Sequence, residues 1–260
     1  MSASTAEPPL IALAGVSRHF GGRAALDGVD LEVGKGAFVA LVGPSGSGKT
    51  SLLKTINRLV DPDQGSVRLA GQDVREMPAA ALRRGIGYVF QDIGLFPHMS
   101  VADNLWIVPR LLGERDGRDA LVADLLDLVA LPRDFAGRMP ASLSGGQAQR
   151  VGVARALAAG PKLVLMDEPF GALDPVTRDE LGRAYRALHD RLRLTTLMVT
   201  HDLAEAMLLA DRIVVLIGGR IRADAAPADL LRGSGDPEVD ALVDVPRRQA
   251  ARLAGLMGPS

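Results

Sequence analysis

A glycine-rich stretch between an apolar segment and a helical segment constrains this chain more than any other feature. Residues 43–50 read GPSGSGKT, which fits the pattern G-x4-G-K-[ST]. The apolar residues 37–42 predict a strand before it, and residues 49–58 predict a helix after it. Glycines let successive backbone N–H groups turn inward as an anion nest, and the helix N-terminus adds partial positive charge. An ordinary glycine-rich turn is the alternative, and the flanking strand and helix argue against it.

The same motif assigns roles to individual side chains. Lys49 is expected to reach the β- and γ-phosphates of a nucleotide, and the Thr50 hydroxyl is expected to ligate Mg²⁺. The predicted nucleotide-binding residues of this loop are Gly43, Pro44, Ser45, Gly46, Ser47, Gly48, Lys49, Thr50 and Ser51.

Two adjacent acids end a second apolar segment. Residues 163–166 predict a buried strand, and Asp167 and Glu168 follow it. Buried carboxylates are costly unless a cation or a reaction uses them. Strand alternation directs neighbouring side chains to opposite faces, so we assign Asp167 to the Mg²⁺ shell and Glu168 to the attacking water, as general base or orienter. A surface pair of acids at a loop edge is the alternative.

The order of the patterns predicts an α/β fold. Residues 34–36 read as a hairpin turn between strands at 29–33 and 37–42. From residue 100 to 159 the apolar spacing is helical, after which strands and helices alternate again. The other expected strands are residues 10–16, 66–69, 86–90, 195–200 and 213–217, and the other expected helices are residues 175–191 and 203–210. This pattern indicates an α/β core with a helical insert.

A second glycine motif begins a helix inside that insert. Residues 143–147 read LSGGQ, and two glycines at a helix N-terminus leave N–H groups free to bind another anion. Two phosphate sites on separate lobes suggest a nucleotide held between two chains. The motif closely resembles the signature of ABC ATPases, although a glycine-rich helix cap is the alternative. The resemblance implies a P-loop NTPase (RecA-like) core with an antiparallel β subdomain and an inserted α-helical signature subdomain.

The family resemblance implies further roles. Two copies of the chain would sandwich ATP head to tail, with Ser144, Gly145, Gly146 and Gln147 of one copy capping the nucleotide of the other. The segment Gly171-Ala172-Leu173-Asp174 resembles the D-loop, from which Asp174 joins the nucleotide site.

Three more residues match family positions. Gln91 resembles the Q-loop glutamine, with a catalytic and a Mg²⁺-binding role, and His201 resembles the catalytic switch histidine. Phe20 matches the aromatic residue that stacks on adenine, with simple packing as the alternative. The other histidines considered, His19 and His189, are expected at the surface.

One branch of the family is favoured by residues 91–112, QDIGLFPHMSVADNLWIVPRLL. This stretch closely resembles importer cassettes for osmoprotectants and other quaternary amines such as glycine betaine, choline or carnitine. The resemblance implies integral membrane permease subunits and an extracytoplasmic binding protein as partners. The residues expected to meet the permease are Leu95, Phe96, Pro97 and His98, while packing of Leu95 and Phe96 inside the helical lobe is the alternative.

Composition limits the remaining possibilities. Apolar residues make up 47% of the chain, enough for a sizeable core. The net charge of −1 and the lack of a basic arm argue against nucleic acid as a partner, and the absence of cysteine excludes disulfides and thiolate chemistry. Neither a secretory signal nor an apolar run of about 20 residues is visible. We therefore expect a peripheral protein at the cytoplasmic face of a membrane.

Domain boundaries and competing functions complete these expectations. We expect the ATPase domain at residues 1–232, its helical subdomain at about 92–159, and a tail at 233–260 that carries a short amphipathic helix near 247–256 but no CBS domains. The alternative transported substrates are polar amino acids or sulfonates. A soluble, non-transport ABC ATPase is the alternative of another class, and a degenerate, non-hydrolysing subunit is disfavoured by the intact Gln91, Glu168 and His201.

Overall fold

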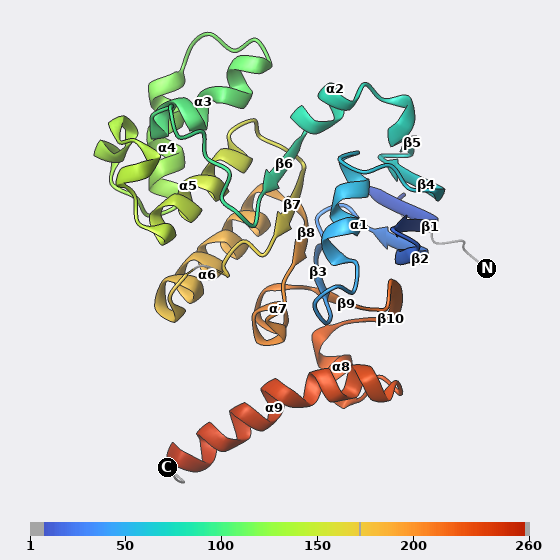
Figure 1. Ribbon diagram of the computed structural model, residues 1–260. Coiled ribbons are helices and arrows are strands. Elements are labelled where there is room, and N and C mark those ends of the chain that lie inside the picture. Colours follow the sequence, from blue (N-terminus) through green and yellow to red (C-terminus); the bar gives the residue numbers. More distant parts are fainter. Residues whose placement is uncertain (1–7, 172, 258–260) are drawn as a thin grey trace, which may run out of the picture.

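The computed structural model describes residues 8–171 and 173–257, which are built around two β-sheets (Figure 1). The strands are β1 (Ile11–Phe20), β2 (Arg23–Val33), β3 (Phe38–Val42), β4 (Gln64–Leu69), β5 (Gln72–Asp73), β6 (Ile86–Val89), β7 (Leu163–Asp167), β8 (Thr195–Val199), β9 (Arg212–Ile217) and β10 (Arg220–Ala225). The α-helices are α1 (Lys49–Ile56), α2 (Ala79–Arg84), α3 (Val101–Leu111), α4 (Arg118–Leu128), α5 (Gly145–Leu157), α6 (Pro175–Leu192), α7 (Leu203–Leu209), α8 (Pro227–Arg232) and α9 (Pro237–Met257).

The larger sheet has the strand order β10-β9-β3-β8-β7-β6. Its strands from β9 to β6 run parallel, and only β10 pairs antiparallel, as a hairpin with β9. Parallel neighbours need crossover connections, which α1, α5 and α6 help to supply. The carboxyl ends of β3, β7 and β8 consequently meet at one edge of the sheet, where ligands of open α/β folds bind.

Each parallel strand buries its two faces in different cores. Helices α3, α4 and α5 form the helical lobe. In β3, Phe38, Ala40 and Val42 join a cluster with this helical lobe and with helices α6, α7 and α9. The intervening Val39 and Leu41 join a second cluster, which α1 shares with the smaller sheet. The period of two along a strand sends alternate residues to opposite faces, so α1 is held between the two sheets.

The smaller sheet is antiparallel, with the order β2-β1-β4-β5. The expectation of a hairpin turn at residues 34–36 is therefore wrong, because β2 and β3 lie in different sheets. The turn is held from a third strand, since the backbone N–H of Gly36 donates to Oγ1 of Thr195 at 2.9 Å. Every residue of β3 is buried, which suits a central parallel strand rather than one arm of a hairpin.

The expected surface position of His189 is also wrong. This residue of α6 is 1% exposed, and its Nδ1 lies 2.9 Å from Oγ1 of Thr196 while Nε2 lies 3.1 Å from the Gly36 carbonyl oxygen. Two polar partners offset the cost of burying the ring. His19, in contrast, is half exposed beside Asp63, as expected.

The tail is more regular than the sequence indicated. Helix α9 begins at Pro237, ten residues before the expected start near residue 247. Val239 and Val243 lie four residues apart on one helical face and are both buried, and α9 packs against α7 and α8. Sequence reasoning also missed β10, whose alternately exposed, charged residues suit an edge strand.

Candidate nucleotide-binding and hydrolysis site

The phosphate loop joins β3 to α1, as its sequence predicts. Gly43 has a φ of 149° and Gly48 a φ of 105°, backbone conformations that side chains with a Cβ rarely adopt. Both glycines also pack against backbone: a Cβ at Gly43 would collide with the Leu216 carbonyl, and one at Gly48 with the Ala25 carbonyl. These two positions therefore require glycine for both conformational and steric reasons.

Lys49 folds back over this loop. Its Nζ donates hydrogen bonds to the carbonyl oxygens of Gly43 at 2.8 Å and Pro44 at 2.9 Å. Burial lowers the pKa of Lys49, and the nearby Glu168 and Asp167 oppose that shift. The hydroxyl of Ser47 is buried without a hydrogen-bond partner. A lysine held in the loop and an unpaired buried donor both suit an oxyanion ligand.

Thr50 and Asp167 meet at the ends of α1 and β7. Oγ1 of Thr50 donates to Oδ1 of Asp167 at 3.0 Å. Asp167 is 4% exposed, and burial raises its pKa, while the hydrogen bond from Thr50 and the charges of Lys54 and Lys49 lower it. Among the described residues there is no cluster of three or more His, Cys, Asp or Glu side chains that could hold a metal. A hydroxyl and one carboxylate fit Mg²⁺, which keeps several waters and binds phosphate oxygens.

Glu168 leaves the strand by a turn and not by strand alternation. Strand β7 ends at Asp167, and Glu168 has a φ of 48°, in the left-handed region. Its N–H donates to the Val199 carbonyl of β8 at 2.9 Å. The carboxylate thereby reaches His201, whose Nδ1 lies 3.2 Å from Oε2 of Glu168. The two acids thus contact different partners, Thr50 for Asp167 and His201 for Glu168, and Glu168 lies in a turn beyond the end of the strand.

Gln91 belongs to the same edge of the larger sheet as Asp167, because β6 runs parallel to β7, whereas Phe20 lies in the smaller sheet. Gln91 follows β6 and is exposed, and the loop just after it is anchored by Arg155 of α5, which donates to the carbonyls of Ile93 at 3.1 Å and Gly94 at 2.6 Å. Phe20 ends β1 and is 47% exposed, with the Arg18 guanidinium 4.8 Å from its ring centre. The ring of Phe20 is therefore accessible at the surface, with Arg18 packed on it.

The signature motif forms the first turn of α5. Oγ of Ser144 accepts from the Gln147 N–H at 3.3 Å, and the Gln147 side chain accepts from the Ser144 N–H at 3.0 Å, which makes a capping box. Ser144 and Gly145 are exposed, and Gly146 is partly exposed. In Figure 1, α5 stands with α3 and α4, and β6 and β7 lie between it and α1. One chain therefore holds the signature and the phosphate loop on different lobes.

The segment resembling a D-loop leads into α6. Asp174 is the N-cap of this helix, where its Oδ1 accepts from the Thr177 N–H at 3.0 Å. Hydrogen bonds from Thr177 lower the pKa of Asp174, so the carboxylate stays ionised at the helix N-terminus. Ala172 lies outside the described residues.

The tail contributes to the site, which no sequence pattern indicated. Leu242, Val245 and Pro246 of α9 line a cavity of about 430 Å³ together with His201 and residues 42–45 at the start of the phosphate loop. Helix α9 lies beside the phosphate loop because β9, β10 and α8 direct the chain back toward the carboxyl end of β3. That return is a tertiary feature without a local sequence signal.

A second, more apolar cavity of about 380 Å³ lies between the core and the helical lobe. Phe96 lines it and is 41% exposed, whereas Leu95 packs partly buried against the core. Pro97 and His98 are exposed. Of the two alternatives for this stretch, internal packing describes Leu95 and surface exposure describes Phe96. The lining residues include Asn57, Leu59, Arg83, Arg84, Tyr88, Phe90, Phe96, Ile107, Leu111 and Arg155.

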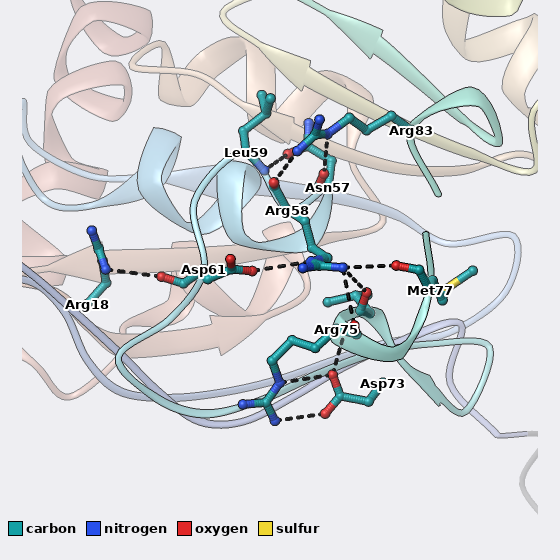
Figure 2. A network of polar contacts seen from close by, with 10 residues as sticks. Arg18, Asn57, Arg58, Leu59, Asp61, Asp73, Arg75, Met77 and Arg83 are labelled. Atoms are coloured by element: carbon teal, nitrogen blue, oxygen red, sulfur yellow. Dashed lines mark hydrogen bonds and ion pairs between the residues drawn. The ribbon is translucent and has the colours of Figure 1, made fainter. Parts of the chain in front are cut away.

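A polar network links this cavity to the phosphate-loop helix (Figure 2). Arg83 of α2 donates to the carbonyls of Asn57, at 3.1 Å, and Arg58 just after α1. The Arg58 guanidinium donates to the carbonyls of residues 74, 75 and 77, including Met77 at 2.9 Å. Helix α1 thus has the phosphate loop at its N-terminal end and this cavity at its C-terminal end.

Comparison with known proteins gives consistent matches. The ABC transporter family profile matches residues 26–171. The choline transport ATP-binding protein OpuBA of Bacillus subtilis (strain 168) is 46% identical over 236 residues, which cover 90% of this chain and 62% of that protein. The glycine betaine uptake system ATP-binding protein YehX of Escherichia coli (strain K12) is 46% identical over 85% of this chain and 72% of its own length. The chain thus spans about three fifths of the first of these relatives.

Two further matches bear on specificity and on fold. A sulfate/thiosulfate import ATP-binding protein of Caulobacter vibrioides is 48% identical over 84% of this chain and 65% of its own length. Among solved structures, the dimeric bacterial ABC transporter cassette MJ0796 superimposes with a TM-score of 0.76 and 32% identity, over 84% of this chain and 98% of that chain. No helix in the part of the chain that the structure describes is long and apolar enough to cross a membrane.

Proposed function

Because the chain belongs to the ABC transporter family, we propose that it is the ATP-hydrolysing subunit of an importer. The observation that carries this proposal is that two pairs of side chains lie together at the carboxyl edge of the larger sheet. The Thr50–Asp167 pair offers a hydroxyl and a carboxylate to Mg²⁺, and the Glu168–His201 pair lies just beyond the ends of β7 and β8. Phosphoryl transfer to water needs these two pairs beside a phosphate nest.

Binding begins at the phosphate loop. The residues that would cradle the ATP phosphates are the loop residues 43–51, of which Lys49 now donates to two loop carbonyls. Phosphate oxygens accept more strongly than carbonyls, so Lys49 exchanges these partners for the β- and γ-phosphates. Phe20 offers an exposed ring to adenine, with Arg18 on it.

Thr50, Asp167 and Gln91 would hold Mg²⁺. The ion would supply charge neutralisation between the β- and γ-phosphates. Oγ1 of Thr50 and Oδ1 of Asp167 are already 3.0 Å apart. Burial raises the pKa of Asp167, and a bound cation would offset the cost of burying its charge. Gln91, exposed after β6, offers a side-chain carbonyl oxygen on the adjacent strand.

Glu168 acts on the water. It accepts a proton from the water as the water oxygen attacks the γ-phosphorus, and the bond from that phosphorus to the β–γ bridging oxygen breaks to give ADP and phosphate. His201, 3.2 Å from the same carboxylate, orients it and donates a hydrogen bond toward the transferred phosphoryl group. Gln91 orients the water from the neighbouring loop.

A second copy completes each site. Ser144, Gly145, Gly146 and Gln147 are on a lobe away from the phosphate loop of their own chain, and their helix N-terminus suits an anion. A head-to-tail homodimer brings them over the ATP of the other copy, with Asp174 at the same interface. The dimeric bacterial cassette of similar fold supports this assembly.

A permease docks at the apolar cavity. Phe96, Phe90 and Leu59 around it are each more than 40% exposed, and exposed apolar side chains gathered around a cavity mark protein contacts. We propose that the region from Leu95 to His98 contacts integral membrane permease subunits there. The chain would lie at the cytoplasmic face of the membrane, with an extracytoplasmic binding protein delivering the substrate.

The transported substrate is proposed from the names of similar proteins. A choline transport protein and a glycine betaine uptake protein are each 46% identical to this chain, which favours a quaternary amine osmoprotectant. The sulfate/thiosulfate relative at 48% identity supports a second candidate, a small inorganic or sulfonate anion. Polar amino acids and a soluble, non-transport ATPase role are the remaining alternatives.

A substitution at Glu168 tests the motor function. Glu168→Gln keeps the phosphate nest but removes the base, so nucleotide affinity should be kept while kcat falls by about 10²- to 10⁴-fold. Glu180→Gln, an exposed acid on α6, is the matched control and should hydrolyse ATP like the wild type. Normal turnover by Glu168→Gln would remove Glu168 from the mechanism.

Uptake in cells tests the substrate. Cells with either wild-type chain or Glu168→Gln as their only copy are given labelled glycine betaine and, separately, labelled sulfate. Loss of glycine betaine uptake only in the variant would support the quaternary amine. Loss of sulfate uptake alone would assign the anion, and equal uptake of both labels in both strains would contradict both substrates.

A further inference from the structure

Gln149 connects the signature helix to the catalytic loop. It belongs to α5 and is 1% exposed. Its Nε2 donates to the carbonyl oxygen of Pro169 at 2.5 Å, and Pro169 directly follows Glu168. A side chain from the helical lobe therefore contacts the backbone next to the proposed base.

Packing alone does not account for a glutamine at this position. Oε1 of Gln149 is buried without a hydrogen-bond partner, and burying an unpaired polar atom is unfavourable. A leucine or methionine has similar size and carries no such atom. The amide thus lies at a position where an apolar side chain would suit burial better, and its one hydrogen bond is to the loop after Glu168.

That loop begins with a backbone conformation that needs support. Glu168 has a φ of 48°, and non-glycine residues stay in this region only where their surroundings hold them. The Glu168 N–H is held by Val199, and the Glu168 carbonyl accepts from the Gly171 N–H at 3.3 Å. The first contact comes from β8 and the second from within the loop itself, whereas the bond from Gln149 comes from the helical lobe.

The signature turn touches the same loop a second time. A Cβ placed on Gly146 would lie 3.2 Å from Cδ2 of Leu173, so the first turn of α5 packs directly against the segment after Pro169. Helix α5 is continuous from Gly145 to Leu157. Displacement of the signature turn therefore moves Gln149 with it.

We propose that Gln149 is a positioning residue for hydrolysis. It holds the backbone of Glu168 in its left-handed conformation, and with it the carboxylate, as long as α5 is in place. A nucleotide bound by the second copy contacts Ser144 of the first copy. Through α5 and Gln149 this contact affects the position of Glu168 in the first copy. The inference rests on the proposed ATPase function for its kinetic test, and on the geometry alone for its structural test.

Two substitutions separate positioning from packing. Gln149→Leu fills the space without a donor, and we expect kcat to fall roughly tenfold, the loss of about one hydrogen bond. The KM for ATP and the nucleotide affinity should stay within about twofold, because the phosphate loop is untouched. Tm should change by less than about 4 °C, since the unpaired Oε1 disappears together with the bond.

Gln149→Glu adds a pH signature. A protonated carboxyl can donate to the Pro169 carbonyl and an ionised one cannot, so the kcat of this variant relative to wild type should fall as pH rises from 6 to 8.5. The matched control is Arg150→Ala. Arg150 is the next residue of α5 and donates to the carbonyls of Val129 and Ala130 at the end of α4, so its loss should leave kcat and its pH profile unchanged.

Amide hydrogen exchange of Glu168, Phe170 and Gly171, the loop residues with a backbone N–H, tests the contact without turnover. Exchange should be faster in Gln149→Leu and unchanged in Arg150→Ala. Unchanged exchange, a wild-type kcat in Gln149→Leu, or a flat relative pH profile in Gln149→Glu would each overturn the positioning role. If the wild-type chain shows no ATPase activity but exchange is still faster in Gln149→Leu, the proposed function would be contradicted and the contact would still be supported.

Discussion

Replacing Gly48 with alanine tests whether the phosphate loop works by its backbone geometry. The residue has a φ of 105°, and a Cβ built there would approach the Ala25 carbonyl oxygen well below the 3.0 Å that real contacts keep. Leu26 Cδ2, at 3.2 Å, crowds it from the same strand. Because the obstacle is backbone of β2, no side-chain rotation relieves the clash.

The magnitude follows from strain and displacement together. A non-glycine residue in a left-handed conformation costs about 1–2 kcal/mol, and overpacking against fixed neighbours costs typically 1–3 kcal/mol. We therefore expect a loss of roughly 2–5 kcal/mol in unfolding free energy and a Tm drop on the order of 5–15 °C. Relief of the clash displaces Lys49 by about 1 Å, which lowers kcat/KM on the order of 100-fold.

Gly46→Ala is the matched control in the same loop. Gly46 has a φ of 75°, but a Cβ there meets nothing within 4 Å. This variant should show only the conformational cost of about 1–2 kcal/mol and a smaller loss of kcat/KM. Steady-state ATPase assays and thermal unfolding of both variants give the comparison. Turnover within threefold of wild type in Gly48→Ala, or equal losses in the two variants, would refute the steric argument.

Three further substitutions test other parts of the site and fold. Burial lowers the pKa of His189 below its ordinary value of 6.5, so the unfolded chain binds the proton more tightly and stability should fall as pH drops below about 6.5; urea unfolding at pH 7.5 and 5.5 should show this loss in wild type and a smaller one in His189→Gln. Ser144→Arg should abolish turnover by blocking the second anion site across the dimer, while nucleotide binding to the isolated chain persists; continued turnover would contradict the shared site. Burial raises the pKa of Asp167, so its ionised form disfavours folding at neutral pH, and Asp167→Asn should raise Tm at pH 7.5 while lowering Mg²⁺-dependent turnover; a lower Tm would show that the carboxylate is stabilising.

The candidate site was predictable from sequence wherever local chemistry dictates structure. The glycines of residues 43–48, the lysine after them and the acids after β7 are defined by what a phosphate nest and a strand end require. The structure brings them together, because carboxyl ends of parallel strands share an edge, and Oγ1 of Thr50 lies 3.0 Å from Oδ1 of Asp167.

What the sequence determined by itself was thus the set of motifs, their order and the α/β alternation around them. Only the tertiary structure decided where segments distant in sequence meet. His189 is buried against Thr196 and Gly36. Residues 34–36 connect two different sheets instead of forming a hairpin. Glu168 reaches His201 from a left-handed backbone conformation. The tertiary structure also joins Gln149 to Pro169. The physical reason is that patterns of period 2 or 3.6 record which face of an element is buried, whereas the partner that covers this face depends on contacts between residues far apart in the chain.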